Sequence, residues 1–475
     1  MLFTSMEFLF LFFPAVILGY FILRGKVRNY WLLAASLFFY AWGEPKFVLA
    51  MLASIIINYA AALSIELLRD KKKICKIVLG LDLVLNLGIL FVFKYMNFVT
   101  GTVLELLPQT GSWLTQTSFV LPIGISFFTF QALSYVVDVY RGIPAQKNPF
   151  YVGLYISLFP QLIAGPIVRY TTIMDQIEER TITWDGFCHG MLRFLYGFNK
   201  KILLANLLAK VADAAFGADV LSTGMAWLGA VCYSLQIFFD FCGYSEMAIG
   251  LGEMFGFHFL ENFDYPYISK TVTEFWRRWH ISLGTWFRDY VYFPLGGSRV
   301  ESKLPLVFNL AVVWFATGIW HGANWTFLLW GIMHGLVIIV EKLNGIPKKA
   351  EERKGFSAAY RVVTLLVVVF GWVLFRAESV ETGFSYIATM LGAGNGGLTD
   401  STFLYYLREN VILLPVGILF AMPVVKLLKA KLSAKGEKAV AVCDYIGCAV
   451  QILLFVVSVS FLVMDAHNPF IYFNF

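Results

Sequence analysis

Apolar segments about as long as a bilayer is thick recur along the whole chain, separated by short polar stretches. A helix of about 20 apolar residues crosses the hydrocarbon core, so the pattern predicts an all-α, polytopic membrane protein. The predicted spans are residues 7–23, 30–42, 47–67, 77–97, 119–139, 187–206, 223–250, 306–320, 324–341, 359–375, 409–427 and 441–464. We find no soluble domain, repeat or low-complexity linker, and expect residues 1–475 to form a single integral-membrane domain.

Two places depart from this simple pattern. Leu158–Arg169, with the sequence LFPQLIAGPIVR, contains two prolines and a glycine that interrupt a helix, which predicts a re-entrant segment rather than a crossing. The segment 306–320 would be only about 22 Å long at 1.5 Å per residue. His321 follows it directly. We therefore expect His321 to lie at a helix break within the hydrocarbon depth.

Composition and charge support the membrane assignment. Of the 475 residues, 59% are hydrophobic and only 14% are charged, too few charges to cover a soluble protein of this size. Placing every basic cluster in the cytoplasm puts the N-terminus outside, with residues 98–118 and 377–408 as the largest outer loops. The clusters are Arg24–Arg28, Arg69–Lys76, Arg141–Lys147, Lys270–Lys303, Lys342–Lys354 and Lys426–Lys438. The net charge of +6 is distributed in short clusters, which indicates membrane topology rather than nucleic-acid binding. The six cysteines lack the spacing of metal ligands, so no metal site is expected.

The stretch Thr273–Gly297, which contains FWRRWHISLGTWFRDYVYFPLGG, concentrates charge and aromatic residues. Drawn as one continuous helix, it places Trp276, His280, Leu283 and Phe287 on one face, with Arg277 and Arg288 at the edge of that face. Guanidinium groups match phosphate oxygens, so this face suits a phosphate-bearing donor. The alternative, which this stretch taken alone favours, is an interfacial helix whose arginines reach lipid headgroups and whose aromatic residues form a belt.

Other polar residues inside predicted spans are candidates for function. An intramembrane histidine at a helix break, such as His321, suggests a functional site, although a hydrogen-bonded core residue is the alternative. Gln236, Asp240 and Glu246 on one aromatic helix indicate either a polar substrate cavity or a network between helices. A buried neutral imidazole can deprotonate an acceptor hydroxyl for attack on a thioester. An ion or proton transporter is the alternative class, but we find no repeated halves.

Several segments together carry a family resemblance. They are Leu121–Gly142, Leu158–Tyr170, Tyr233–Gly256, Asn262–Gly297, Thr317–Gly335 with its WHG motif, Phe370–Ser379 and Asn468–Phe475. With them the chain resembles the membrane-bound O-acyltransferases, in particular the bacterial branch that is similar to alginate O-acetyltransferase. The resemblance implies a ring of about 11–12 transmembrane helices with re-entrant segments around a central tunnel. It also implies a multi-pass protein of the bacterial cytoplasmic membrane.

The resemblance further implies roles for individual residues. The histidine of the WHG motif is His321, expected to be catalytic, and the polar residue that closes the WRRW motif is His280, the second important position. The implied reaction is transfer of an acetyl group from a cytoplasmic thioester to a polysaccharide, with acetyl-CoA as the donor, no bound cofactor and an extracytoplasmic SGNH-type partner. Arg277 and Arg288 are expected to bind the donor. D-alanyl transfer from a carrier protein is the alternative within the family. The remaining histidines, His189, His258, His334 and His467, are expected to tolerate replacement better.

Overall fold

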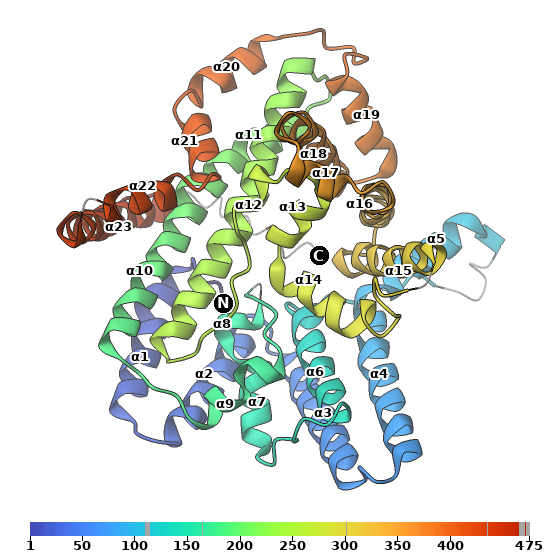
Figure 1. The fold of residues 1–475 in the computed structure, drawn as a ribbon, viewed down its shortest axis with the longest axis vertical. Coiled ribbons are helices and arrows are strands. Elements are labelled where there is room, and N and C mark those ends of the chain that lie inside the picture. Colours follow the sequence, from blue (N-terminus) through green and yellow to red (C-terminus); the bar gives the residue numbers. More distant parts are fainter. Residues whose placement is uncertain (110–114, 164, 301, 435, 465–470, 472–475) are drawn as a thin grey trace. The chain divides into compact units, whose positions relative to one another are not determined.

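The computed structural model describes residues 1–475 except 110–114, 164, 301, 435, 465–470 and 472–475. Over these described residues the chain is helical and contains no strand (Figure 1). It divides into two compact units: Met1–Phe194 with Met247–Leu260, and Leu195–Glu246 with Glu261–Phe475. The prediction of one domain is not decided by this division, because two helices, Trp184–Lys200 (α10) and Thr223–Met254 (α12), contribute residues to both units.

The first unit is built from short and medium helices, of which α3, α4 and α6 pack against one another (Figure 1). Its elements before α10 are η1 (Phe8–Phe12), α1 (Phe13–Ile22), α2 (Val27–Gly43), α3 (Val48–Leu67), α4 (Lys72–Lys94), α5 (Met96–Leu106), α6 (Ile125–Tyr140), α7 (Pro149–Ser157), α8 (Phe159–Leu162) and α9 (Tyr170–Glu178). The helix break predicted in Leu158–Arg169 is confirmed. It falls between α7 and α8, and Pro160 occupies the first turn of α8, where its missing N–H costs nothing.

The second unit contains the long C-terminal helices. Its elements besides α12 are η3 (Lys201–Ala205), α11 (Asn206–Phe216), η4 (Pro266–Ile268), α13 (Val272–Arg278), α14 (Ile281–Phe287), η5 (Arg288–Tyr292), α15 (Lys303–His321), α16 (Trp325–Leu343), α17 (Ile346–Glu352), α18 (Lys354–Arg376), α19 (Val380–Met390), α20 (Ser401–Glu409), α21 (Leu413–Phe420), α22 (Val424–Ser433) and α23 (Glu437–Met464). Helices α15 and α16 form a tight hairpin. A Cβ atom on Gly331 would come within 2.8 Å of the Gly318 Cα, so only glycine allows this approach.

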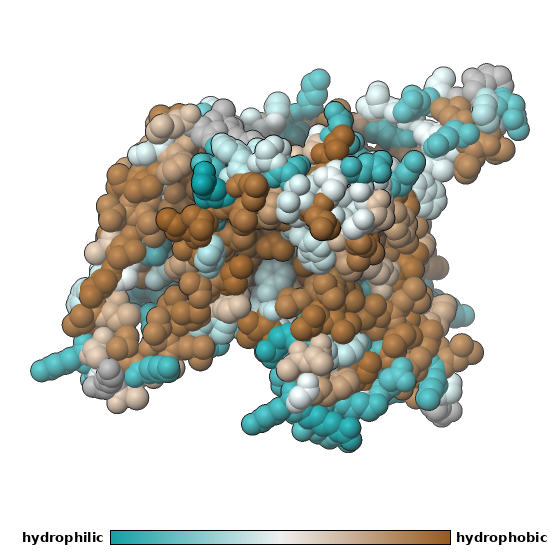
Figure 2. Space-filling view, turned by 90° about the horizontal axis from the view of Figure 1, so that it is seen from above, coloured by the Kyte–Doolittle hydropathy of each residue, from teal (hydrophilic) through white to brown (hydrophobic). Residues whose placement is uncertain are grey.

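Seven of the helices in the described part of the chain are long and apolar enough to cross a membrane: α3, α4, α12, α15, α16, α18 and α23. An eighth is possible if α20 and α21, which meet at a 62° bend, form one broken span. Hydrophobic side chains cover much of the face seen in Figure 2. The all-α polytopic prediction is confirmed. Fewer long helices are found than the 11–12 predicted, because segments such as Phe8–Ile22 and Ile125–Tyr140 are apolar but short.

The two carboxylates of α12 that were singled out, Asp240 and Glu246, form ion pairs. The Lys201 ammonium lies 2.6 Å from Asp240, and each of these two side chains is only 2% exposed. The neighbouring pair, Lys200 and Glu246, is 2.8 Å apart with both side chains 21% exposed. Asp240 also accepts a hydrogen bond from the backbone N–H of Ile471. For Asp240 and Glu246 the structure therefore favours the network interpretation.

The two ion pairs should differ in their effect on stability. Asp240→Ala leaves the Lys201 charge buried without its carboxylate, and breaking a buried pair in this way typically costs about 3–5 kcal/mol. Glu246→Ala is the matched control, because the Lys200 side chain that it leaves has partial access to solvent. Thermal unfolding of the purified protein should show a clearly larger loss for Asp240→Ala. Equal losses for the two variants would contradict this interpretation.

Candidate functional site

The stretch around His280 is not one helix. Helix α13 ends at Arg278 and α14 begins at Ile281, and between them His280 has a φ of 46°. Only His280 and Tyr265 among the described non-glycine residues have a positive φ, a conformation that is costly and often found at functional sites. The predicted helical face that joined Trp276, His280, Leu283 and Phe287 is therefore wrong, because the helix breaks at the residue on which that face was centred.

Hydrogen bonds from a neighbouring segment replace the helical bonds lost at this break. The backbone N–H of Asp264 donates to the Arg278 carbonyl, and the N–H of Ile281 donates to the Asn262 carbonyl, both at 3.0 Å. Buried backbone groups must find partners, so the segment that begins at Asn262 stabilises the interruption. Periodicity within 274–290 cannot reveal this, because the partner lies outside that window.

The side chain of Asn262 fixes the tautomer of His280. Asn262 Oδ1 lies 3.2 Å from the backbone N of Ser282, which can only donate, so this atom is an oxygen. The same oxygen is 3.1 Å from His280 Nδ1, which must then carry the proton and donate it. It also accepts from the Ser282 hydroxyl at 2.9 Å, while Asn262 Nδ2 donates to Ser245. The Nε2 atom of His280 is therefore left with a lone pair.

Burial keeps this imidazole neutral. His280 is 2% exposed, its ring lies edge-to-face on Phe241 with centroids 4.5 Å apart, and no described residue hydrogen-bonds to its Nε2 atom. Removal from water lowers the pKa of His280 from its ordinary value of 6.5 to about 3. At neutral pH His280 therefore presents a buried hydrogen-bond acceptor.

His321 is the last residue of α15, as predicted, but α15 is not short. It begins at Lys303, so its 19 residues span about 28 Å, close to the thickness of a bilayer core. The expectation that a short helix sets the depth of His321 is therefore wrong. Its burial comes from packing: the side chain lies among the rings of Trp320, Trp330 and Phe375, with centroids at 5.0, 4.9 and 5.3 Å.

In the structure both candidate histidines lie next to the ring of Trp320. The ring of Trp320 lies 6.1 Å from that of His280 and 5.0 Å from that of His321. A third buried histidine, His334, accepts a hydrogen bond from the Trp276 indole at 3.3 Å and lies 5.2 Å from Trp330. Sequence reasoning found both candidate histidines and the WHG motif that contains Trp320, but it missed the contact of Trp320 with His280 and the Asn262 side chain that holds His280.

The other histidines belong to the first unit or fall outside the described residues. His189 is exposed and pairs with Glu253 in the first unit at 2.7 Å, and His258 is exposed in the same unit. His467 falls outside the described residues. Their tolerance to replacement stays a prediction. Replacement of His334 is expected to affect stability, because its side chain is buried among indole rings.

The two arginines do not line one helix face. Arg277 lies near the end of α13 and Arg288 begins η5, with the break at His280 between them. Both are exposed at the surface of the second unit. Two hydrogen bonds from Arg288 to Asp289, at 2.8 and 3.3 Å, orient its guanidinium and raise its pKa. A further cation lies near this region, since the Lys342 ammonium is 5.3 Å from the ring of Tyr292.

Comparisons with known proteins identify relatives over most of the chain. Residues 78–385 match the model of MBOAT, the membrane-bound O-acyltransferase family. The chain is 43% identical over 425 residues to the probable alginate O-acetylase AlgI of Pseudomonas aeruginosa, covering 88% of this chain and 79% of that protein. The corresponding protein of Pseudomonas putida is 39% identical over the full length of both. The peptidoglycan O-acetyltransferase of Helicobacter pylori is 32% identical, covering 100% of this chain and 98% of that protein.

The buried neutral state of His280 predicts a dependence of stability on pH. Because its pKa falls from 6.5 in the unfolded chain to about 3 in the folded protein, the unfolded chain binds the proton between these values. Stability should then fall as the pH drops below 6.5, by about 1.4 kcal/mol per unit from this group. Thermal unfolding of His280→Gln between pH 7.5 and 4.5 should show a shallower decline than the wild type.

The exposed His258 provides the matched control for this measurement. His258→Gln makes the same substitution at an exposed position, so it shows what the replacement of a histidine by glutamine does without burial. If the stability of His280→Gln falls with pH as steeply as that of the wild type, the burial of His280 does not cost the protein stability in acid.

Proposed function

Because the chain belongs to the membrane-bound O-acyltransferase family, we propose that it carries an acetyl group from acetyl-CoA, bound at the cytoplasmic face, to a hydroxyl presented from outside. The product is an O-acetylated polysaccharide of the cell envelope or extracellular matrix, and the location is the bacterial cytoplasmic membrane. The observation that supports this reaction best is that two buried imidazoles, those of His280 and His321, both lie next to the ring of Trp320. Such a pair can both move a proton and orient a reactant.

In the proposed step His321 is the general base. An imidazole nitrogen of His321 takes the proton of the acceptor hydroxyl while the hydroxyl oxygen bonds to the acetyl carbonyl carbon. The carbon–sulfur bond then breaks, coenzyme A leaves as a thiolate, and the thiolate takes up the proton from the imidazolium. The aromatic rings around His321 support this role, because they exclude water that would otherwise hydrolyse the thioester. The enzyme itself is not acylated.

His280 has a different role in this proposal. Its Nδ1 proton is engaged by Asn262, so the neutral ring offers an acceptor at Nε2 and has no second N–H to donate. Stabilising negative charge on the thioester oxygen requires a donor. The tautomer therefore supports the orienting role, in which His280 accepts a hydrogen bond from an O–H or N–H group of a substrate.

The donor and the acceptor are proposed to approach from opposite faces. The phosphate groups of acetyl-CoA carry negative charge that suits the exposed Arg277 and Arg288 on the predicted cytoplasmic side. On the outer side, an SGNH-type partner is proposed to receive the acetyl group and to modify the polysaccharide.

His321→Ala should reduce acetyl transfer by about 10²–10⁴-fold, the usual contribution of general acid–base catalysis, in a protein that unfolds at a similar temperature. His280→Ala should cost less, and the amide of His280→Asn should retain part of the rate. His189→Ala is the control, because His189 lies exposed in the first unit. The assay follows thiol release and label transfer from acetyl-CoA with the purified full chain.

Two results would contradict the assignment. Wild-type activity in a well-folded His321→Ala protein would remove His321 from the reaction. A protein that carries an ion across liposome membranes and never consumes acetyl-CoA would instead be a transporter.

The arginines provide a second test. Arg277→Glu and Arg288→Glu should each raise the KM for acetyl-CoA by about tenfold, the equivalent of one charge-assisted contact, with little change in kcat. The effect of Arg277→Glu should be the larger, because Asp289 already balances the charge of Arg288. Arg408→Glu, in a predicted outer loop, serves as the control. Unchanged KM values in both variants would support the alternative in which these arginines contact lipid headgroups.

A further inference from the structure

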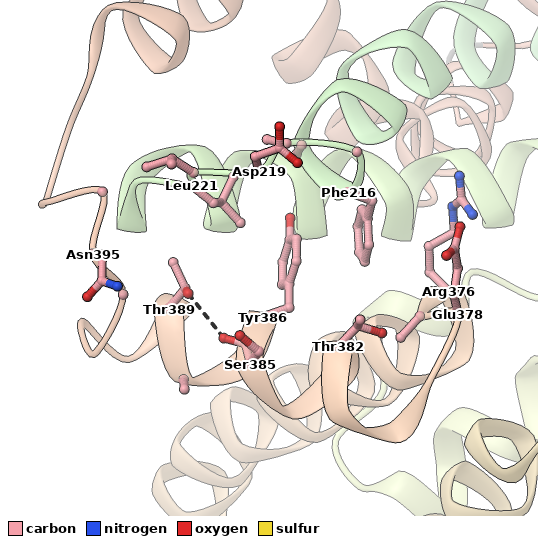
Figure 3. Close-up of a pocket in the computed structure, with 18 of the residues that line it drawn as sticks. Phe216, Asp219, Leu221, Arg376, Glu378, Thr382, Ser385, Tyr386, Thr389 and Asn395 are labelled. Carbon is pink, nitrogen blue, oxygen red and sulfur yellow. Dashed lines mark hydrogen bonds between the residues drawn. The ribbon is translucent and has the colours of Figure 1, made fainter.

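The second unit contains a cavity that the proposed proton transfer does not use. Its volume is about 660 Å³, within the range of about 300–1,000 Å³ that ligand sites commonly occupy. It is lined by the end of α11, the loop that leads into α12, the end of α18, and α19 with the residues that follow it (Figure 3). All the lining residues belong to this one unit.

The predicted topology puts this cavity on the outer side of the membrane. Its lining comes from residues 213–221 and 376–396. With every basic cluster in the cytoplasm, the stretch between the predicted spans 187–206 and 223–250 lies outside, as does the loop 377–408. An extracytoplasmic protein that receives the acetyl group would therefore approach the chain from the side on which the cavity lies.

Contacts connect the lining of the cavity to the end of α15 that carries His321. The His321 ring packs against Phe375, and the next residue, Arg376, lines the cavity. Asn324, in the turn that follows His321, donates a hydrogen bond to the carbonyl of Glu378 at 2.9 Å. The cavity thus adjoins the end of the helix on which the candidate base lies.

The aromatic pair Phe216 and Tyr386 gives the cavity a fixed wall but no free aromatic face. The two rings are stacked with centroids 4.3 Å apart and an interplanar angle of 11°, so each covers the other (Figure 3). The Tyr386 hydroxyl donates to the Ala226 carbonyl at 3.0 Å, and the Arg376 guanidinium lies 5.7 Å from the Phe216 ring. Recognition in this cavity is therefore expected to come from its charged and polar groups.

The lining of the cavity has a surplus of negative charge. The Asp213 carboxylate is balanced by Arg376, whose guanidinium lies 2.8 Å from it. Asp219 and Glu378 are exposed on the lining, and neither carboxylate pairs with a cation among the described residues (Figure 3). Two carboxylates are thus available to a cationic group that enters from outside.

The predicted outer segments around the cavity carry the same sign of charge. Residues 207–222 and 377–408 contain more carboxylates than cations. They are Asp213, Asp219, Glu378, Glu381 and Asp400, against Lys210 and Arg408. The predicted topology depends on Lys and Arg alone, so the surplus of Asp and Glu is an independent observation. A surface of this charge attracts a basic partner and steers its approach.

We propose that this cavity is a docking site for a basic segment of the extracytoplasmic protein that receives the acetyl group, with lysine or arginine side chains of that segment against Asp219 and Glu378. The proposal rests on the proposed transfer through such a partner, and it names where the partner binds and which chemistry recognises it. Because the cavity adjoins the end of α15, a partner docked there is held beside the helix end that carries His321.

The test measures peptide binding to the full chain in nanodiscs of phosphatidylcholine, a lipid without net charge. The probes are a short photoreactive peptide of alternating lysine and glycine and the same peptide with glutamine in place of every lysine. The lysine peptide should bind about tenfold more tightly, the equivalent of one charge-assisted contact. Its photolabel should fall within residues 213–221 or 376–396, and its affinity should decrease as the salt concentration rises.

Three double variants make the measurement specific. Asp219→Asn with Glu378→Gln should weaken binding of the lysine peptide about tenfold. Asp219→Lys with Glu378→Lys should instead bind a glutamate peptide of the same length. Glu105→Gln with Glu381→Gln is the matched control, since both carboxylates are exposed in predicted outer loops and neither lines the cavity, and it should leave the affinity unchanged.

Any of four results would overturn the proposal. They are equal affinity for the lysine and glutamine peptides, no effect of Asp219→Asn with Glu378→Gln, photolabelling outside the cavity, and displacement of the lysine peptide by a lower concentration of glycerophosphoethanolamine. The last result would assign the cavity to a lipid headgroup.

Thiol release from acetyl-CoA, measured on the same preparations, keeps this result separate from the proposed function. If acetyl-CoA is consumed but the lysine peptide does not bind, only the assignment of the cavity fails. If the peptide binds in the cavity but acetyl-CoA is never consumed, the assignment of acetyl-CoA as donor fails instead.

Discussion

One oxygen atom, Oδ1 of Asn262, organises the centre of the second unit. It accepts hydrogen bonds from the His280 ring and from the backbone and hydroxyl of Ser282. Convergence of these donors holds the chain in a left-handed turn that an ordinary residue would avoid. The orientation of the His280 ring, its tautomer and the change of direction between α13 and α14 therefore depend on the same interaction.

Around this turn the chain builds an interior of indole and phenyl rings. Trp276, Trp330 and Trp372 contact one another with centroids 5.3–6.3 Å apart, and His321 and His334 both pack on Trp330. Rings of this size bury large apolar areas in fixed edge-to-face geometries. His321 and His334 are thereby held in a dry environment of packed aromatic rings.

The sequence predicted well those features that depend on local composition. The predicted spans overlap six of the long helices, α3, α4, α12, α16, α18 and α23. In lipid the backbone of a long apolar segment must satisfy its hydrogen bonds within the segment, and a helix does this. The break in Leu158–Arg169 was likewise visible in its prolines. Features that depend on distant partners were not predicted. The periodicity of 274–290 indicated a helix, whereas hydrogen bonds from Asn262 and Asp264, which lie outside that window, stabilise a break in it.

In the candidate site, too, local features were predicted from the sequence and features that depend on distant partners were not. His321 was found from its motif and from its position at a helix end, but the explanation from a short helix failed once Lys303 proved to begin α15. Trp320 is the first residue of the WHG motif, but the motif does not show that its ring lies next to His280 as well as His321. The contact between Trp320 and His280 depends on how the chain returns from α14 to the end of α15, and no local sequence pattern predicts that path.

The close glycine contact between α15 and α16 has a consequence for motion. Where Gly318 and Gly331 meet, the backbones are already near van der Waals contact, so neither helix can slide or rotate past the other without a collision. His321 is attached to the end of this hairpin and cannot travel toward a reactant by a shift of one helix along the other. Any movement of the chain around His321 must then come from elements outside the hairpin, while the end of α15 stays in place.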